Sequence, residues 1–233
     1  MIRWKAPGPY EVVFSTRAGG VSEGPYSSLN LGRLTGDDVE RVDENRRRLC
    51  AEVGAEPERL ALNRQVHSAL VHRADPARRG EPGDGLWSDE PGQPLLAFTA
   101  DCLPLALVRR NGTAPAVAVL HAGWRGLLDG IVAAGVRALG GGELAACVGP
   151  AIGPCCYEVG PEVAEPFAAA YGPDVLRGRH LDLWGAAEAA LREAGVASVE
   201  RVDLCTHCNP ELFFSHRRTG LPRGVQGVIA RVA

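Results

Sequence analysis

The chain has 233 residues, of which 45% are hydrophobic and 23% are charged, and its formal net charge is -3 at pH 7. This length and composition indicate one globular domain over residues 1–233, with a full hydrophobic core. The densest basic block, Arg46–Arg48, is too short for a nucleic-acid-binding tail, and no segment approaches the roughly 18 apolar residues of a membrane span. We therefore expect neither nucleic acid nor a membrane as a partner.

Cysteine usage bears on the cellular compartment. The chain contains seven cysteines, and its first residues, Met1–Pro7, lack the apolar core of a signal peptide. An odd number of cysteines without an export signal favours reduced thiols or metal ligands over a disulfide framework. The sequence predicts a cytoplasmic protein.

The first predicted strand lies at Tyr10–Ser15, followed by a turn at Gly19-Gly20 and a polar loop through Asn30. A helix follows over about Asp38–Val53, with Asp37 or Asp38 as its N-cap and Gly54 as its C-terminal stop. Further strands are predicted at Leu95–Phe98, Leu103–Val108, Ala116–Leu120, Ala145–Val148, Val199–Leu204 and Val225–Val232. Further helices are predicted at Leu127–Leu139, Pro161–Tyr171 and Leu183–Ala194.

This mixed order of strands and helices predicts the α+β class, in the form of a mixed αβ sandwich with a mixed β-sheet and flanking helices. The Gly-rich breaks at 77–83 and 140–142 are predicted to be surface loops. The order of the elements does not determine the sheet topology.

One arginine interrupts the apolar stripe of the first predicted helix. Val39, Val42, Leu49 and Val53 define the stripe, and Arg46 falls in its middle. A guanidinium that faces the interior loses hydration and must meet an anion, which is either a protein carboxylate or a bound ligand. Phosphate suits such a forked donor well, and both partners stay open.

A histidine ends the predicted strand at Ala116–Leu120. It opens the segment His121–Gly126, with the sequence His-Ala-Gly-Trp-Arg-Gly, which leads into the helix at Leu127–Leu139. Junctions of this kind are where α/β sheets place ligand sites. A lone histidine at a strand end can equally hydrogen-bond a backbone carbonyl, so other residues must decide its role.

Two more segments place polar groups in apolar surroundings. His67 follows an alternating apolar pattern, and Asp101-Cys102 lies between two apolar strands. If His67, Cys102 and His121 converge, they form a His2Cys set, which suits zinc with an open fourth position. Their spacing matches no local metal motif, and a buried structural cysteine is the alternative for Cys102.

Taken in order, these and other short blocks resemble the YfiH-like laccase-domain family, also called the multicopper polyphenol oxidoreductase or purine nucleoside phosphorylase family, over essentially the whole chain. The blocks that carry the resemblance are Phe14–Val21, Ser28–Gly32, Gly36–Asp38, Asn45-Arg46, Gln65–His67, Thr99–Pro104, His121–Gly126, Gly149–Val159 and Phe213–Ser215. Small departures occur at Ser68, His216 and Leu86-Trp87, where the family usually has glycine, tyrosine and a stretch without tryptophan. They leave the candidate ligands intact.

The resemblance implies a zinc ion held by His67, Cys102 and His121, and phosphorolysis of purine nucleosides. Adenosine, inosine and methylthioadenosine are the implied substrates, with phosphate as co-substrate and adenosine deamination as a second activity. Arg46 would contact phosphate, with Arg125 as a helper. Asp101 is a candidate general acid or a carboxylate that orients a zinc ligand, and a structural turn is its alternative role. The sequence leaves the preferred nucleoside and the oligomeric state open.

Copper-dependent phenol oxidation is the older activity attached to this family. A blue-copper centre commonly has a weak axial methionine, yet Met1 is the only methionine in the chain. A multicopper oxidase also needs several more histidines than the His67 and His121 pair, and the whole chain has six. We therefore expect zinc, although copper can compete for these ligands in vitro.

Two other readings of the cysteines are possible, and the first uses the same residues as the zinc site. Cys102 could be the nucleophile of a cysteine hydrolase, with His121 or His67 as base and Asp101 as the orienting acid. Alternatively, Cys205–Cys208 and the adjacent pair Cys155-Cys156 could form a structural zinc module. We disfavour this module because adjacent cysteines seldom chelate one zinc comfortably and a core of this size needs no metal staple.

Overall fold

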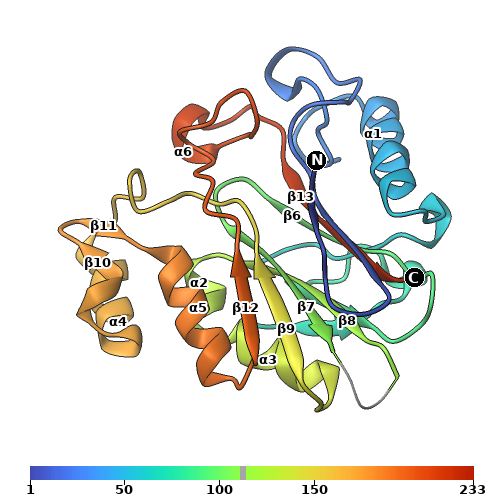
Figure 1. Cartoon of the computed structure of the whole chain (residues 1–233). Coiled ribbons are helices and arrows are strands. Elements are labelled where there is room, and N and C mark those ends of the chain that lie inside the picture. Colours follow the sequence, from blue (N-terminus) through green and yellow to red (C-terminus); the bar gives the residue numbers. More distant parts are fainter. Residues whose placement is uncertain (111–113) are drawn as a thin grey trace.

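Two β-sheets pack face to face at the centre of the molecule, and helices cover both outer faces (Figure 1). The computed structural model describes residues 1–110 and 114–233. Its helices are α1 (Val39–Glu52), α2 (Trp124–Leu128), α3 (Ile131–Leu139), α4 (Pro161–Tyr171), α5 (Leu183–Glu193) and α6 (His216–Thr219). No helix in these two ranges is both long enough and apolar enough to span a membrane.

The first sheet has five strands and is antiparallel except for the pairing of β3 with β6. In spatial order its strands are β1 (Ile2–Trp4), β2 (Tyr10–Phe14), β13 (Gln226–Val232), β6 (Leu95–Thr99) and β3 (Ala61–Leu62). The chain therefore closes its first sheet with its last strand, which lies between two strands from the N-terminal half.

The second sheet has six strands, with parallel pairs at its two edges and antiparallel pairs between them. In spatial order its strands are β12 (Ser198–Arg201), β9 (Leu144–Val148), β7 (Leu103–Arg109), β8 (Val117–Ala122), β5 (Gly85–Ser88) and β4 (Val71–Arg73). A separate two-stranded ribbon pairs β10 (Leu176–Arg177) with β11 (His180–Leu181). The mixed αβ sandwich expected from the sequence is confirmed.

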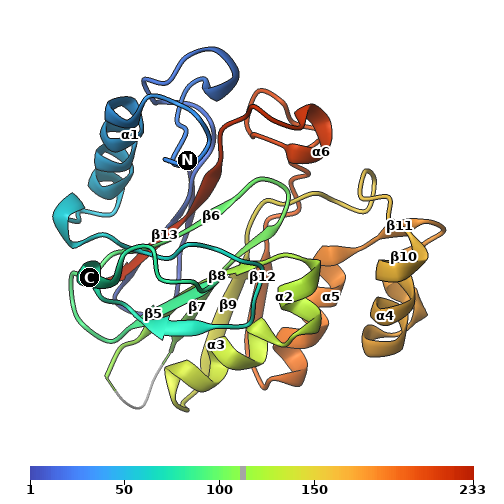
Figure 2. The same ribbon diagram turned by 180° about the vertical axis from the view of Figure 1, so that it is seen from behind.

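Each central strand contributes to two layers because successive side chains point to opposite faces. In β2, Val12 and Phe14 enter the core between the two sheets, whereas Val13 packs under α1. In β8, Val119 faces the other sheet, and Leu120 packs against the helices that cover the second sheet, seen in front in Figure 2. A central strand with both faces buried therefore needs a continuous run of apolar residues. Such runs explain why the central strands could be predicted from the sequence.

The prediction for α1 is confirmed at both ends. Asp38 caps the helix by accepting hydrogen bonds from the backbone N–H groups of Glu40 and Arg41, and Gly54 follows with a φ of +62°. A left-handed residue at this position ends a helix, and glycine adopts it without a Cβ clash. The stripe is shorter than predicted, since Val39 is 49% exposed whereas Val42 and Leu49 are buried.

Three other boundaries differ from the sequence predictions. The predicted helix at Leu127–Leu139 is two helices, α2 and α3, because Gly130 adopts a φ of +86° between them. The predicted strand at Val199–Leu204 ends earlier, at Arg201. Strand β8 runs on to Ala122, so that His121 lies inside the strand and not in the loop after it.

Candidate active site and metal centre

Three segments that are distant in the sequence bring His67, Cys102 and His121 together. One nitrogen or sulfur from each residue lies within 4.8 Å of the others. Cys102 ends the turn before β7, and β7 pairs with β8 so that Pro104 lies opposite His121. The distance between Cys102 Sγ and His67 Nε2 is 4.0 Å. The predicted ligand residues therefore meet in space, which their spacing in the sequence alone could not show.

A buried aspartate that the sequence analysis missed, Asp84, orients both histidines. Its Oδ1 atom lies 2.8 Å from His121 Nδ1. The same carboxylate accepts hydrogen bonds from the backbone N–H groups of His67 and Ser68, at 3.0 and 2.7 Å. This contact leaves His121 Nε2 free and would fix it as the metal-binding nitrogen, as in the carboxylate–histidine pairs of metal sites. The only trace in the sequence is a lone acid between Gly83 and Gly85, a signal too weak to assign a role.

Gly123 leaves the space that the three ligands occupy. A Cβ atom on this residue would lie 2.9 Å from His67 Cδ2 and 3.1 Å from Cys102 Sγ. Any larger side chain would therefore displace a candidate ligand. The lack of space beside the candidate ligands gives a physical reason for glycine at position 123, within the His121–Gly126 segment that carries the family resemblance.

Backbone strain is concentrated beside the same three ligands. Among the residues that the structure describes, His67 and Asp101 are the non-glycine residues with positive φ, at +61° and +91°. Such conformations cost free energy and persist where the surrounding structure imposes them, often at functional sites. The turns that present His67 and Cys102 are therefore held in shape by their surroundings.

Electrostatics favours the thiolate form of Cys102. Burial by itself raises the pKa of this thiol, but the charge of His121 and hydrogen bonds from both histidines outweigh burial and lower the pKa to about 6. Burial lowers the pKa of His121, whereas Cys102 and Asp84 raise it to about 9. Thiolate and imidazole nitrogen are the donors that zinc prefers, so the donor set fits zinc.

Asp101 connects the turn that contains Cys102 to the C-terminal part of the chain. Its Oδ1 accepts a hydrogen bond of 2.6 Å from the Thr206 hydroxyl, and its Oδ2 accepts one of 2.7 Å from the backbone N–H of Arg217. The acid that orients His121 is therefore Asp84, and not Asp101 as the cysteine-hydrolase reading required. General acid catalysis by Asp101 stays a prediction.

Arginines surround the centre on the side of α6 and α2. Burial lowers the pKa of Arg223, which the sequence analysis did not single out, and the charges of Asp101 and Cys102 only partly oppose this shift. Arg125 is exposed and stacks on the Trp124 ring, with its Cζ atom 4.1 Å from the ring centroid. Arg223 therefore lies close enough to Cys102 for their charges to interact, whereas Arg125 contacts Trp124 and no candidate ligand.

The predicted interior arginine, Arg46, borders a cleft. Its Nε donates to the carbonyl of Leu31 at 2.8 Å, and its Cζ lies 5.2 Å from the centroid of the Phe98 ring. Within residues 1–110 and 114–233, no carboxylate lies within ion-pair distance of it. Burial, and then the charge of Arg33, lower the pKa of Arg46 to about 10.

The cleft has a volume of about 510 Å³ and is lined by Arg46, and none of His67, Cys102 and His121 lines it. Its lining includes Arg79 and Phe98, and also Gln65 and Arg223, which connect it to the turn of His67 and to Cys102. The structure thus brings His67, Cys102, His121 and Asp101 together and leaves Arg46 and Arg125 at the periphery. Arg33 in this lining pairs with Asp43, whereas no carboxylate of the described residues lies within ion-pair distance of Arg46 or Arg79. These two guanidinium groups suit an anionic ligand.

Comparison with protein families identifies a match over residues 11–232. The matching family is described as multi-copper polyphenol oxidoreductase laccase. A purine nucleoside phosphorylase of Pseudomonas aeruginosa is 42% identical over 226 residues, which cover 93% of this chain and 91% of that protein. The purine nucleoside phosphorylase YfiH of Escherichia coli is 39% identical over 229 residues, with the same two coverages.

Solved structures show the same fold. A Neisseria meningitidis protein of the DUF152 family superposes with a TM-score of 0.89 at 34% identity, over 99% of this chain and 98% of that one. YlmD from Geobacillus stearothermophilus superposes with a TM-score of 0.88 at 33% identity, over 96% and 92% of the two chains. The similarity therefore extends over the whole fold, including the segments that carry the candidate ligands.

Proposed function

Because this chain belongs to the multi-copper polyphenol oxidoreductase laccase family, we propose that it is a zinc-dependent purine nucleoside phosphorylase acting on adenosine, inosine and methylthioadenosine. The names of its relatives support the reaction class, at identities of 34 to 42%. The observation that carries the proposal is the His67–Cys102–His121 centre beside a cleft that Arg46 borders without a carboxylate partner. The protein's partners would be a purine nucleoside and phosphate.

Zinc suits the donor set better than copper does. His67, Cys102 and His121 would hold the ion, with Asp84 fixing the ring of His121. A bound zinc ion would supply Lewis-acid polarisation of a substrate atom. In the part of the chain that the structure describes, the other group of metal-binding side chains contains four cysteines and no histidine. This composition argues against a multicopper cluster, although copper can enter a His2Cys set in vitro.

In phosphorolysis, a phosphate oxygen forms a bond to the anomeric carbon of the ribose while the bond from that carbon to the purine nitrogen breaks. The departing purine takes up a proton, and the products are the free base and ribose 1-phosphate. Arg46 would hold the phosphate, since its guanidinium lies on the cleft with Arg79 nearby. Positioning two reactants in this way lowers the entropic part of the barrier.

Arg125 would assist, and its exposed guanidinium stacks on Trp124. Asp101 is one residue from Cys102, and its two hydrogen bonds hold that turn against the C-terminal segment. We therefore assign Asp101 a positioning role first and proton donation to the purine second. Adenosine deamination at the same centre is the second activity that the sequence resemblance implies.

One specific observation favours a second candidate, a cysteine hydrolase. The pKa of Cys102 is lowered to about 6 beside His121, which Asp84 orients, and this order resembles a nucleophile, base and acid. The two candidates differ in their requirement for phosphate and in their sensitivity to metal removal. Alkylation of Cys102 would inactivate either enzyme, so alkylation alone does not discriminate.

The deciding experiment measures hypoxanthine release from inosine with and without phosphate, before and after treatment with a chelator. A phosphorylase forms ribose 1-phosphate and stops when phosphate is omitted, and its activity returns when zinc is restored. An unchanged rate without phosphate would contradict the proposal. Appearance of inosine from adenosine in phosphate-free buffer would demonstrate the deaminase activity separately.

A further inference from the structure

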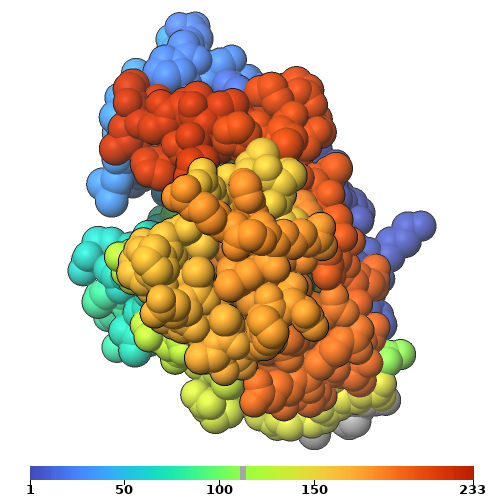
Figure 3. Space-filling view, turned by 90° about the vertical axis from the view of Figure 1, so that its left-hand side faces the viewer, coloured from blue at the N-terminus to red at the C-terminus, as the bar shows by residue number. Residues whose placement is uncertain are grey.

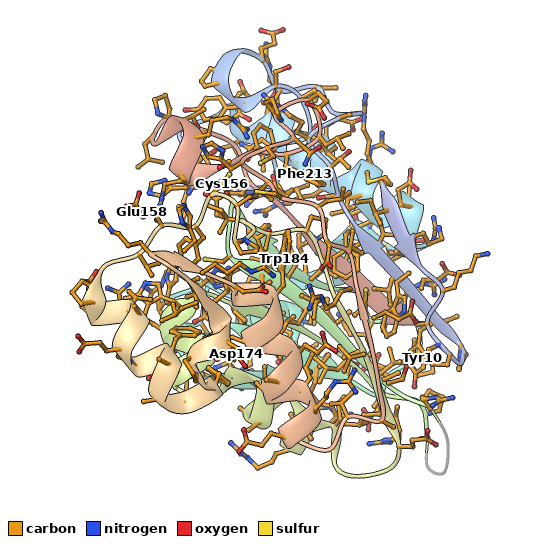
Figure 4. All side chains as sticks on the ribbon, turned by 60° about the vertical axis from the view of Figure 1, so that its left-hand side comes forward. Tyr10, Cys156, Glu158, Asp174, Trp184 and Phe213 are labelled. Atoms are coloured by element: carbon orange, nitrogen blue, oxygen red, sulfur yellow. The ribbon has the colours of Figure 1, made fainter. Side chains whose placement is uncertain are left out.

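Four cysteines outside the proposed active site form a second cluster. The Sγ atoms of Cys155, Cys156, Cys205 and Cys208 all lie within 4.8 Å of one another. They come from two loops, one after β9 and one after β12. In Figure 4, the labelled Cys156 and Glu158 belong to the first loop and Phe213 to the second. The sequence analysis disfavoured a site here because two of the cysteines are adjacent, but in the structure both of these sulfurs lie close to those of Cys205 and Cys208.

The distances between the sulfur atoms match a tetrahedral metal site. Cys208 Sγ lies 3.6 Å from Cys155 Sγ and 3.3 Å from Cys156 Sγ. A zinc ion with zinc–sulfur bonds of about 2.3 Å separates its four sulfur ligands by about 3.8 Å. A disulfide requires about 2.05 Å. We propose that these four cysteines bind a zinc ion as a tetrathiolate, separate from the His67–Cys102–His121 centre.

Local backbone structure explains how both loops present their sulfurs on one side. The segment Cys205–Cys208 forms a turn, and the backbone N–H groups of Gly153 and Cys208 donate to Cys205 Sγ, the first at 3.2 Å. The adjacent pair lies in a second turn, in which Cys156 and Tyr157 both donate to the carbonyl of Gly153 at 3.0 Å. Adjacent side chains diverge in a strand, but a turn removes that restriction.

Charge near the cluster favours a tetrathiolate. Four thiolates around one divalent cation carry a net charge of about -2, which N–H donors and nearby cations stabilise. The guanidinium of Arg218 donates to the carbonyls of Thr206 and His207, at 2.7 and 3.0 Å, inside the Cys205–Cys208 turn. A fixed cation therefore lies within the turn that supplies two of the four ligands.

The proposed ion would connect two loops that both contact Asp101, the neighbour of Cys102, through Ile152 and Thr206. The loops already meet through the backbone N–H of Thr206, which donates to the carbonyl of Ala151 at 3.0 Å. The Thr206 hydroxyl in turn holds Asp101 next to Cys102. Figure 3 shows the C-terminal segment, in red, lying over the loop after β9, in yellow. The second metal would stabilise this contact locally, while the large sandwich core maintains the overall fold.

Metal analysis tests the proposal on the full-length protein purified under reducing conditions. We expect two equivalents of zinc in the wild type and one in the variant Cys155→Ser/Cys208→Ser, which changes two exposed ligands. The matched variant His67→Ala/His121→Ala should also retain one equivalent, held by the four cysteines. The proposal is wrong if the Cys155→Ser/Cys208→Ser variant binds as much zinc as the wild type, or if the His67→Ala/His121→Ala variant binds none.

Cobalt titration of wild-type protein stripped of metal gives a result that does not depend on how the variants fold. Thiolate-to-cobalt charge-transfer absorption grows with the number of coordinating thiolates. The two sites together supply five thiolates, so the wild type should show roughly five times the absorption expected of the single-thiolate His67–Cys102–His121 site. Absorption equal to that of a single-thiolate site in the wild type would overturn the proposal. A disulfide among these cysteines in freshly reduced protein, found by intact mass, would do the same.

Discussion

The His67–Cys102–His121 centre and the four-cysteine cluster are both groups of metal-binding side chains, but they are built differently. The first combines three segments and has a buried carboxylate, Asp84, behind one ligand. The second combines two loops, uses only thiols, and has backbone N–H donors around Cys205. Catalytic zinc sites have three protein ligands and an open position, whereas structural sites are closed by four. Ligand number and surroundings therefore suggest reaction chemistry at the first group and stabilisation of loops at the second.

The largest expected effect comes from a substitution in the His67–Cys102–His121 centre, which we call the three-ligand centre. Replacing His121 by alanine removes one proposed ligand and leaves Asp84 without its imidazole partner. Phosphorolysis of inosine should fall by more than about 100-fold, because even loss of a group that only orients a ligand costs about 10- to 100-fold. Steady-state kinetics and zinc content measure the two consequences.

The four-cysteine cluster serves as the internal control for this variant. The thiolate-to-cobalt absorption of this cluster should stay at the wild-type level in His121→Ala, because the two groups of side chains share no residue. Loss of absorption from both groups together would show that the substitution disrupts the whole fold, and the comparison would then fail.

A second prediction tests the anion site that accompanies only the three-ligand centre. Arg46→Ala should lower kcat/KM by about 10- to 150-fold, chiefly through a higher KM for phosphate, since one charge-assisted contact contributes about 1.5 to 3 kcal/mol. Zinc content should not change, because Arg46 contacts Leu31 and Phe98 and no ligand. Initial rates at varied phosphate concentrations measure the effect.

Arg47→Ala and Arg48→Ala are the matched controls on the same helix. Both side chains pair with Glu44, and exposed pairs of this kind contribute little to stability. Equal kinetic effects in all three variants would refute the assignment of Arg46 to phosphate. A large drop in melting temperature in Arg46→Ala, with an unchanged KM for phosphate, would instead indicate a structural role.

The smallest expected effect tests whether Asp84 orients His121 and leaves the four-cysteine cluster unaffected. Asp84→Asn keeps the shape of the side chain but removes the charge that orients His121 and accepts from the turn of His67. Zinc affinity at the three-ligand centre should weaken about 10-fold. Competition with a chromogenic chelator measures the dissociation constant, and the four-cysteine cluster should keep its own. If both sites weaken equally, or neither does, Asp84 does not position His121.

Elements that depend on a few neighbouring residues could be predicted from the sequence. Helix α1 has its cap at Asp38 and its stop at Gly54 within the chain itself, and α4 spans Pro161–Tyr171 as predicted. Strands such as β7 carry long apolar runs because both of their faces are buried. The short edge strands β1 and β4, of three residues each, were missed because so few residues carry no detectable period.

The candidate ligands His67, Cys102 and His121 came from the sequence through its resemblance to a family, and not from their spacing. Arg46 came from a break in helical periodicity, although Val39, assigned to the same stripe, is exposed. In each case the sequence indicated the residue types and left the partners open.

Tertiary structure alone decided which residues meet. The pairing of β7 with β8 places Cys102 beside His121, and β5 next to β8 brings Asp84 to the same histidine. The contact between the loops after β9 and β12 likewise assembles four thiols. Helix ends and apolar periods depend on interactions between residues a few positions apart. Contacts between distant segments depend on strand order and register, which no short stretch of this sequence encodes.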